Sequence, residues 1–217
     1  MKKRLKIALF MIAPLSFGGG TEKYFINLTK NLSEKNIKVD IITMDNSFNK
    51  VFIRLINIYY LKDLFKKTTK TGRENKGTIE KNLGKGKWIR SSWKNLKKIL
   101  NNYDIIYTKN ELVDLFLLKS ISYSKLPPII VGVHTPIYFP ITKSFYSKFH
   151  NFLYMGPVYK WLIEGTNLIH APNKYTQHLF DNNFKVKTKL VYHPFSVENT
   201  SNDTPRRRAS GYLTRIG

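Results

Sequence analysis

Short apolar runs alternate along this chain with segments in which apolar residues recur at helical spacing. The first run, residues 5–11, is apolar apart from one lysine, as expected of a strand covered on both faces. The next segment repeats apolar residues at Phe25, Leu28 and Leu32. This alternation predicts an α/β fold with a doubly wound, mostly parallel, Rossmann-like sheet. We expect strands at residues 5–11, 37–43, 104–108, 128–133, 168–171 and 187–192, and helices at residues 21–35, 48–67, 88–100, 111–121, 143–163 and 174–182.

Three segments depart from the simple pattern. Residues 68–87 are rich in Lys, Gly, Thr and Asn without a period, so we expect a loop there. Gly156 and Pro157 interrupt the helix of residues 143–163, because proline lacks the backbone donor. The basic start and the apolar run after it resemble a signal peptide, but no small-x-small cleavage site follows, and we favour a buried first strand. No run reaches the roughly 18 apolar residues of a membrane span.

Positive charge dominates the composition, with 37 Lys and Arg against 14 Asp and Glu and a formal net charge of +23. Such a field attracts polyanions, whether nucleic acid, anionic lipid or phosphorylated substrates. A general bias toward Lys, Asn and Ile is the alternative explanation. Residues 48–100 hold 15 basic and 3 acidic residues, which is about half of the excess. The chain has no cysteine, so a disulfide scaffold, a thiol nucleophile and a Cys-ligated metal are excluded.

Two features are expected at one edge of the sheet. Gly18, Gly19 and Gly20 stand between the first strand and the first helix, where backbone N–H groups can approach an anion. A tight turn is the alternative, and Lys23 occupies the third glycine position of G-x-G-x-x-G. His134 directly follows the strand at residues 128–133, so it belongs at the same carboxyl edge. An imidazole there can bind a hydroxyl or phosphate group or exchange a proton, although a structural histidine is the alternative.

An ordered set of segments resembles family-four glycosyltransferases of the GT-B fold. The opening, from Gly19-Gly20-Thr21-Glu22 to the strand ending at Thr43, is similar to the family's Gly-Gly-small-Glu, helix and "L-x-x-x-G-H-x-V-x-V-x-T" pattern. Asn36 and Ile37 depart from its Gly-His pair. Later segments that resemble the family in the same order are 103–107, 133–135, 167–173, where Asn173 replaces Ser, and 189–198, where Phe195-Ser196 replaces Asn-Gly.

The resemblance implies a sugar transferase that uses a nucleotide-sugar as its substrate and needs no cofactor or metal. Gly19, Gly20 and Thr21 would lie near the donor diphosphate. His134 would contact the transferred sugar or the acceptor hydroxyl. Glu22 is a second catalytic candidate, with favourable interaction at the helix N-terminus as its alternative. The histidines other than His134 show no metal-ligand spacing.

The resemblance also predicts how the chain divides. Residues 1–198 would be the acceptor-side N-terminal domain, and residues 199–217 a linker and the start of the donor-binding domain. Because that second domain does not follow, we expect the chain to be inactive alone, as a fragment, a truncated frame or half of a split enzyme.

The basic, aromatic segment at residues 48–100 predicts peripheral docking on an anionic membrane, which would suit a lipid-linked glycan acceptor. We expect the protein in the cytoplasm, with the inner face of the cell membrane as the docking surface. The alternative is that the aromatic residues of this segment pack on the sheet. The residues assigned to the membrane or acceptor are Phe48, Phe52, Arg54, Lys62 and Lys66.

Two rival functions are a basic nucleic-acid-binding α/β domain and a non-catalytic glycosyltransferase-like subunit. The sequence contains no recognised RNA- or DNA-binding motif.

Overall fold

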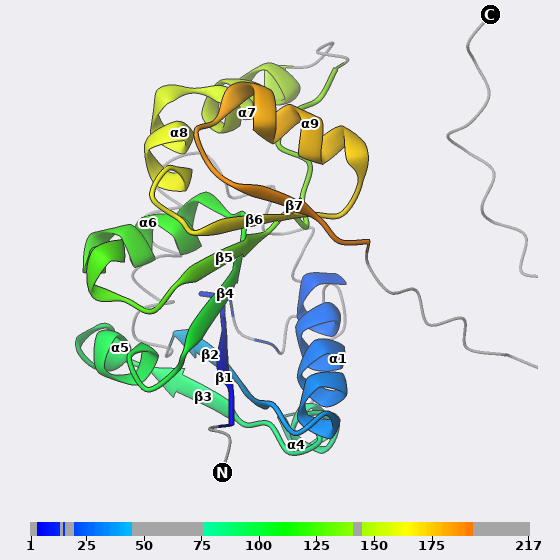
Figure 1. Cartoon of the computed structure of the whole chain (residues 1–217), viewed down its shortest axis with the longest axis vertical. Coiled ribbons are helices and arrows are strands. Elements are labelled where there is room, and N and C mark those ends of the chain that lie inside the picture. The colour runs from blue at the N-terminus through cyan, green and yellow to red at the C-terminus, as the bar shows by residue number, and fades with distance from the viewer. Residues whose placement is uncertain (1–3, 14, 16–19, 45–75, 141–144, 193–217) are drawn as a thin grey trace, which may run out of the picture.

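The computed structural model describes residues 4–13, 15, 20–44, 76–140 and 145–192. Within them, one sheet has the strand order β3-β2-β1-β4-β5-β6-β7 (Figure 1). Each neighbouring pair of strands is parallel, which confirms the predicted Rossmann-like sheet. The strands are β1 (Lys6–Phe10), β2 (Lys38–Met44), β3 (Trp88–Ser91), β4 (Ile105–Lys109), β5 (Ile129–Gly132), β6 (Leu168–Ala171) and β7 (Thr188–Leu190).

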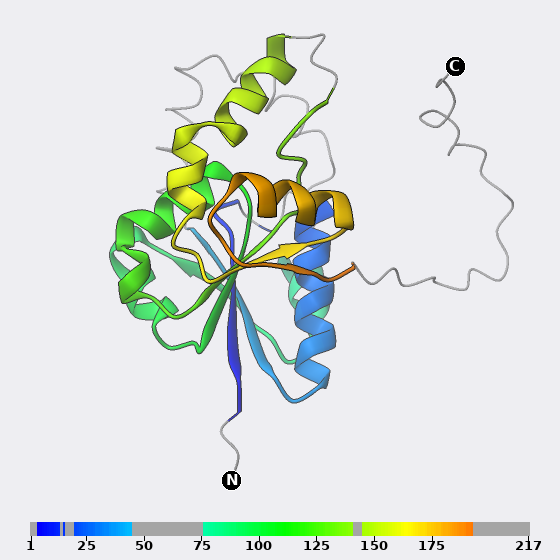
Figure 2. The same ribbon diagram turned by 45° about the horizontal axis from the view of Figure 1, so that its top comes forward.

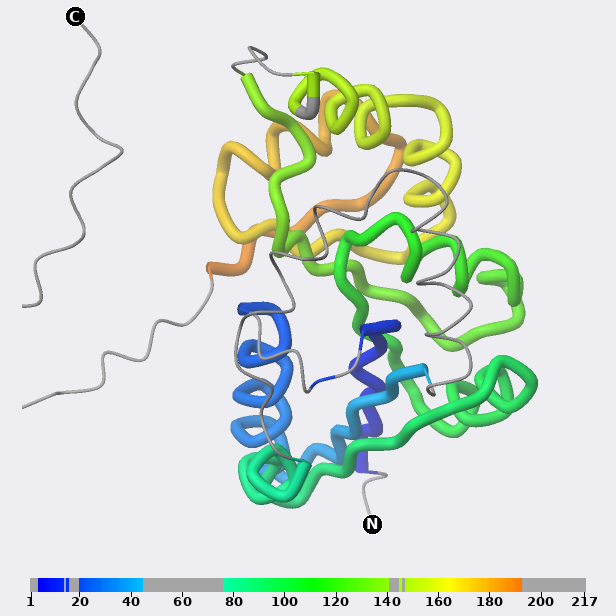
Figure 3. Tube along the Cα trace, turned by 180° about the vertical axis from the view of Figure 1, so that it is seen from behind, coloured from blue at the N-terminus to red at the C-terminus, as the bar shows by residue number. Residues whose placement is uncertain are grey.

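Helices cover both faces of this sheet. Figures 1 and 3 show α1 and α4 on one face and α5 and α6 on the other. This division follows from right-handed crossovers, because the chain winds outward from β1 to β3 and then returns to wind from β4 to β7. The helices are α1 (Gly20–Glu34), α4 (Lys76–Lys81), α5 (Trp93–Leu100), α6 (Leu112–Ile121), α7 (Phe145–Met155), α8 (Pro157–Ile163) and α9 (Lys174–Asn183), with a short 3₁₀ helix, η2 (Tyr123–Lys125).

The core is divided by the sheet into two apolar clusters. In β1, Leu9 packs with Phe25 of α1, whereas the next residue, Phe10, packs with residues of α5 and α6. Ile41 and Ile42 of β2 divide in the same way. Successive side chains of a strand point to opposite faces, and here both faces are covered. The central strands therefore place apolar residues on both faces rather than alternating apolar with polar ones.

Local signals fix several helix boundaries where they were expected. The segment 143–163 is divided at Gly156, with Pro157 at the first turn of α8, as predicted. A Cβ at Gly156 would collide with the Phe152 carbonyl oxygen, which accounts for glycine at this junction. Asn173 caps α9, because its side chain accepts a hydrogen bond from the Thr176 amide at 2.8 Å.

Two expectations for residues 68–100 were wrong. Residues 88–91 form β3 rather than the first turn of a helix, so the sheet has seven strands among the described residues where six were expected. Pairing with β2 decides this, and the Trp88 indole N–H donates to the Thr43 hydroxyl at 2.9 Å. Within the expected loop, α4 forms because Ile79 is fully buried against the α1 face of the sheet. The predicted helix at 48–67 and the predicted domain boundary at residue 198 lie outside the described residues, so both stay predictions.

Candidate functional site

The strand order creates a switch point between β1 and β4. These strands are neighbours, but the chain continues from them in opposite directions, to β2 on one side and to β5 on the other. In open α/β sheets, ligands bind outside the carboxyl ends of the strands at such a point. Here that edge gathers the residues after β1, the first turn of α1, and the residues that follow β4 and β5.

The first turn of α1 supplies the described part of the glycine loop. Gly18 and Gly19 lie outside the described residues, whereas Gly20 is exposed at the start of α1. A Cβ at Gly20 would meet no atom of the described residues within 4 Å. Thr21 is half-buried and Glu22 is buried. The N-terminal N–H groups of a helix favour an anion, which is the chemistry predicted for this turn.

His134 lies at the same edge of the sheet as the start of α1. Its ring centroid is 4.6 Å from that of Tyr24, which is one turn into α1. The imidazole therefore packs between this helix and the sheet, and its Nε2 lies 3.2 Å from the Tyr107 hydroxyl. The structure thus brings His134 together with the start of α1. Gly18 and Gly19 lie outside the described residues, so the meeting of the glycine loop with this histidine stays a prediction.

Asn110 positions the His134 loop and was not identified from the sequence. It follows β4, is fully buried, and its side-chain oxygen accepts from the amides of His134 at 3.0 Å and Thr135 at 3.3 Å. Its side-chain amide donates to the Thr135 carbonyl at 3.0 Å. One buried amide therefore ties the ends of β4 and β5 together. Its place directly after a buried strand was the available signal.

A buried ion pair at the switch point was also missed. Lys109 ends β4, and its ammonium lies 3.8 Å from Oδ2 of Asp114, whereas Asp114 Oδ1 accepts the Ile12 amide at 2.8 Å. Burial raises the pKa of Asp114 to about 7, although Lys109 and the Ile12 amide both act to lower it. Burial acts to lower the pKa of Lys109, but the carboxylates of Asp114, Glu111 and Glu22 leave that pKa above its ordinary value. The pair connects the loop after β1 to the start of α6.

A cavity of about 280 Å³ adjoins His134. It lies between the loop after β5 and the first turns of α9, and it combines hydroxyl and amide groups with aromatic and apolar walls. Such a lining suits a ligand that has both hydroxyl groups and an apolar face. Its lining residues are Val133, His134, Thr135, Pro136, Ile137, Tyr138, Pro172, Asn173, Tyr175, Thr176 and Leu179.

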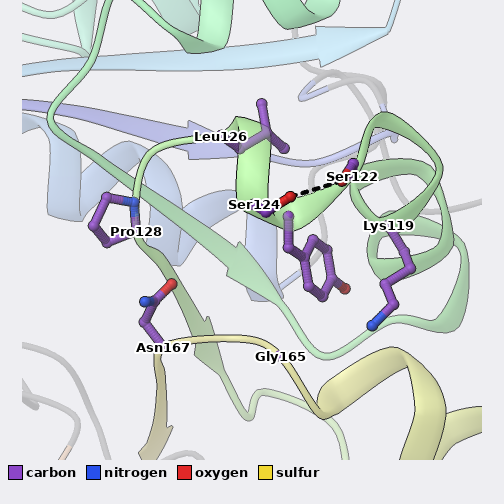
Figure 4. Close-up of a pocket in the computed structure, with 8 residues that line it drawn as sticks. Lys119, Ser122, Ser124, Leu126, Pro128, Gly165 and Asn167 are labelled. Atoms are coloured by element: carbon purple, nitrogen blue, oxygen red, sulfur yellow. Dashed lines mark hydrogen bonds between the residues drawn. The ribbon is translucent and has the colours of Figure 1, made fainter.

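A larger hollow of about 540 Å³ lies at the opposite edge, before β5 and β6 (Figure 4). Its polar groups already have protein partners: Lys119 donates to the Glu164 carbonyl at 3.0 Å, and the Ser122 and Ser124 hydroxyls share a hydrogen bond. The Asn167 side chain accepts the Ile129 amide at 2.8 Å. These contacts hold the turns at the amino ends of the strands, so size alone does not make this hollow the ligand site.

The residues assigned to the membrane, Phe48, Phe52, Arg54, Lys62 and Lys66, lie outside the described residues, and their role stays a prediction. Within the described ranges, no group of three or more His, Cys, Asp or Glu residues could hold a metal ion. In the same part of the chain, no helix has the length and apolar character needed to cross a membrane.

Comparison with known protein families gives a match over much of the chain. The profile of Glycosyltransferase Family 4 matches residues 18–198, which is most of the chain. No curated protein matches it. The match begins in the glycine loop, includes Glu22, Lys109 and His134, and ends beyond β7.

Proposed function

This chain belongs to glycosyltransferase family 4, and we propose that it forms the acceptor-side domain of an enzyme that transfers a sugar from a nucleotide-sugar to a hydroxyl group. The observation that supports this most is the sharing of one sheet edge by His134 and the start of α1, with Tyr24 of α1 packed on the imidazole. A family assignment alone does not locate a site, whereas this edge has the expected groups beside the switch point.

Each candidate residue has a role that its chemistry supports. The backbone N–H groups at Gly20 and Thr21 would stabilise negative charge on the donor diphosphate. His134 would hydrogen-bond the acceptor hydroxyl or the transferred sugar. Glu22 is close enough to Lys109 to raise its pKa, and as a carboxylate it suits a sugar hydroxyl better than a phosphate.

The nucleotide-sugar would bind mainly to a second domain that closes over this edge. In this proposal the domain described here supplies the acceptor side of the site, and a donor-binding domain completes it. A non-catalytic role is the rival within the family, and saccharide binding at His134 without transfer in the presence of a donor domain would support that rival.

Saccharide binding at His134 provides the first test. We expect titration of the ¹⁵N-labelled chain with a panel of mono- and oligosaccharides to shift the resonances of His134, Thr135 and Glu22. His134→Ala removes one hydrogen bond, so it should weaken the binding of any responding saccharide by about threefold to tenfold. His178→Ala, which changes an exposed histidine on α9, should leave the affinity unchanged.

The proposal is wrong if saccharides perturb only the Lys119–Asn167 hollow, or if His178→Ala and His134→Ala have equal effects. The same labelled chain can be titrated with random oligonucleotides. Salt-dependent shifts with oligonucleotides, and none with saccharides, would instead support the nucleic-acid-binding alternative.

We further propose that the domain docks on an anionic membrane face, and α7 provides the supporting observation among the described residues. Phe145, Phe149 and Phe152 recur along one side of α7 and are exposed by 83%, 47% and 68%. The rings of Phe145 and Phe149 stack, with their centroids 6.1 Å apart. Lys148 is exposed on the same helix, which has no acidic residue. Figure 2 shows α7, the yellow-green helix at the top, at the outer end of the domain.

Vesicle binding tests this docking surface. We expect the chain to co-sediment with vesicles that contain phosphatidylglycerol and much less with neutral phosphatidylcholine vesicles. Phe149→Ser should weaken binding to the anionic vesicles by about tenfold, because a buried aromatic side chain contributes about 1.5 kcal/mol or more. Phe116→Ser is the matched control, since Phe116 is at least as exposed as Phe149 but lies on α6. Equal losses in the two variants would contradict a specific role for α7.

A further inference from the structure

A buried tyrosine bridges two histidines on the α1 face of the sheet. The Tyr107 hydroxyl lies 2.8 Å from Nδ1 of His170 and 3.2 Å from Nε2 of His134. Nε2 of His170 lies in turn 2.7 Å from the carbonyl oxygen of Val191. The four residues therefore form one chain of hydrogen bonds, which runs from the candidate site to the backbone just beyond β7.

The number of available protons fixes the direction of each bond. A carbonyl oxygen only accepts, so Nε2 of His170 bears a proton and donates it to Val191. In a neutral imidazole, Nδ1 of His170 is then an acceptor, and the Tyr107 hydroxyl donates its single proton to it. Tyr107 has no second proton to offer, so Nε2 of His134 must be the donor to the Tyr107 oxygen.

Burial keeps the His170 imidazole neutral and the Tyr107 hydroxyl protonated, as these hydrogen-bond directions require. Burial lowers the pKa of His170, although its hydrogen bond to the Val191 carbonyl opposes that change. Burial also raises the pKa of Tyr107 far above its ordinary value. At neutral pH the tyrosine therefore keeps its proton, and His170 stays uncharged.

Two neighbours hold the tyrosine in this position. Gly132 lies on β5, between the strands of Tyr107 and His170, and a Cβ there would collide with the Tyr107 hydroxyl. Its missing side chain provides the room for the bridge. From α1, the ring of Phe25 packs edge-on against that of Tyr107, with their centroids 5.9 Å apart.

We propose that Tyr107 and His170 are positioning residues that hold His134 in its Nε2–H tautomer, with the lone pair of the ring on Nδ1. The use of this tautomer rests on the proposed function, in which His134 forms a hydrogen bond with a sugar or acceptor hydroxyl. Tyr107 and His170 act only through His134. The chain of bonds ends on the Val191 carbonyl, so the tautomer also depends on how the backbone beyond β7 is held.

The tautomers can be measured directly on the chain labelled with ¹⁵N at histidine. Long-range proton–nitrogen correlation spectra at about pH 8, where an ordinary imidazole is neutral, distinguish a protonated ring nitrogen from an unprotonated one. We expect His134 and His170 each to have a protonated Nε2 and an unprotonated Nδ1. His134→Gln and His170→Gln assign the signals. An Nδ1–H tautomer at either histidine overturns the proposal.

Tyr107→Phe provides a second measurement, because it removes only the bridging hydroxyl. We expect His134 to lose its single tautomer, so that its two ring nitrogens move toward averaged shifts. Tyr123→Phe is the matched control, since it removes a hydroxyl that donates to the Leu162 carbonyl at 2.8 Å in the other half of the core. It should leave the His134 signals unchanged.

A folded Tyr107→Phe variant in which His134 keeps its tautomer would remove the positioning role. If that variant does not fold, the wild-type spectrum decides the proposal. These spectra need no saccharide. An unexpected tautomer would therefore overturn only the positioning role, whereas the saccharide titrations test the proposed transferase function.

Discussion

Replacing Asp114 with asparagine is expected to remove a pH-dependent loss of stability of roughly 4 kcal/mol between about pH 4 and pH 7. Asp114 is fully buried at the start of α6, and burial raises its pKa from 3.8 to about 7. Below pH 4 the carboxyl is protonated in the folded and unfolded states alike. As the pH rises toward 7, the unfolded state releases the proton while the folded state retains it, so unfolding becomes easier.

Asparagine reproduces the protonated carboxyl in shape but does not titrate. Its side-chain oxygen can still accept the Ile12 amide, which now donates to Asp114 at 2.8 Å. Lys109 keeps Glu22 and Glu111 as charged neighbours in the variant. The free energy of unfolding of the variant, relative to that of the wild type, should therefore increase as the pH rises. This difference should stop increasing once the wild-type carboxyl is ionised in both the folded and the unfolded state.

Urea unfolding followed by tryptophan fluorescence, at intervals from about pH 4 to pH 8, measures this difference. Asp181→Asn is the control, because Asp181 is an exposed carboxylate on α9 and its replacement should leave the pH dependence close to that of the wild type. Parallel stability curves for the wild type and Asp114→Asn would show that Asp114 is ionised in the folded state throughout, and would refute the raised pKa.

The sequence predicted those parts of the fold that depend on local pattern. The strand at 168–171 has the predicted bounds, and the helix before it is interrupted at the predicted proline. β3 was missed because its four residues, Trp88–Ser91, adjoin a helical pattern, and only their pairing with β2 makes them a strand. A short edge strand has too few residues for a period of its own.

The edge on which His134 lies could be predicted for the same reason. A residue that directly follows a strand of a parallel sheet must lie at the carboxyl edge, whichever strands are its neighbours. The contacts of His134 could not be predicted, because they depend on strand order and register. Tyr107 and His170 come from strands that are separated by β5, and they meet only across the space at Gly132. The Lys109–Asp114 pair likewise depends on the angle at which α6 leaves β4.

Gly132→Ala is expected to destabilise the fold by about 1–3 kcal/mol, because it adds a methyl group to a filled space. A Cβ at Gly132 would lie 2.6 Å from Cζ of Tyr107 and 2.7 Å from Nε2 of His134, and still closer to the Tyr107 hydroxyl. These separations are too short for a methyl group, so the tyrosine ring or the imidazole must move. Either movement breaks the hydrogen bond between Tyr107 and His134.

The loss should depend on the Tyr107 hydroxyl, which a double-mutant cycle can measure. Adding Tyr107→Phe to Gly132→Ala removes the atom closest to the new methyl group, so the two changes together should cost less than the sum of their separate costs, by about 1 kcal/mol. Gly77→Ala in α4 is the control, because a Cβ there meets no atom within 4 Å, and alanine at this helical position should be neutral or slightly stabilising. Additive costs in the cycle would mean that the methyl group is accommodated without moving Tyr107, and that the space at Gly132 does not set the geometry of the bridge.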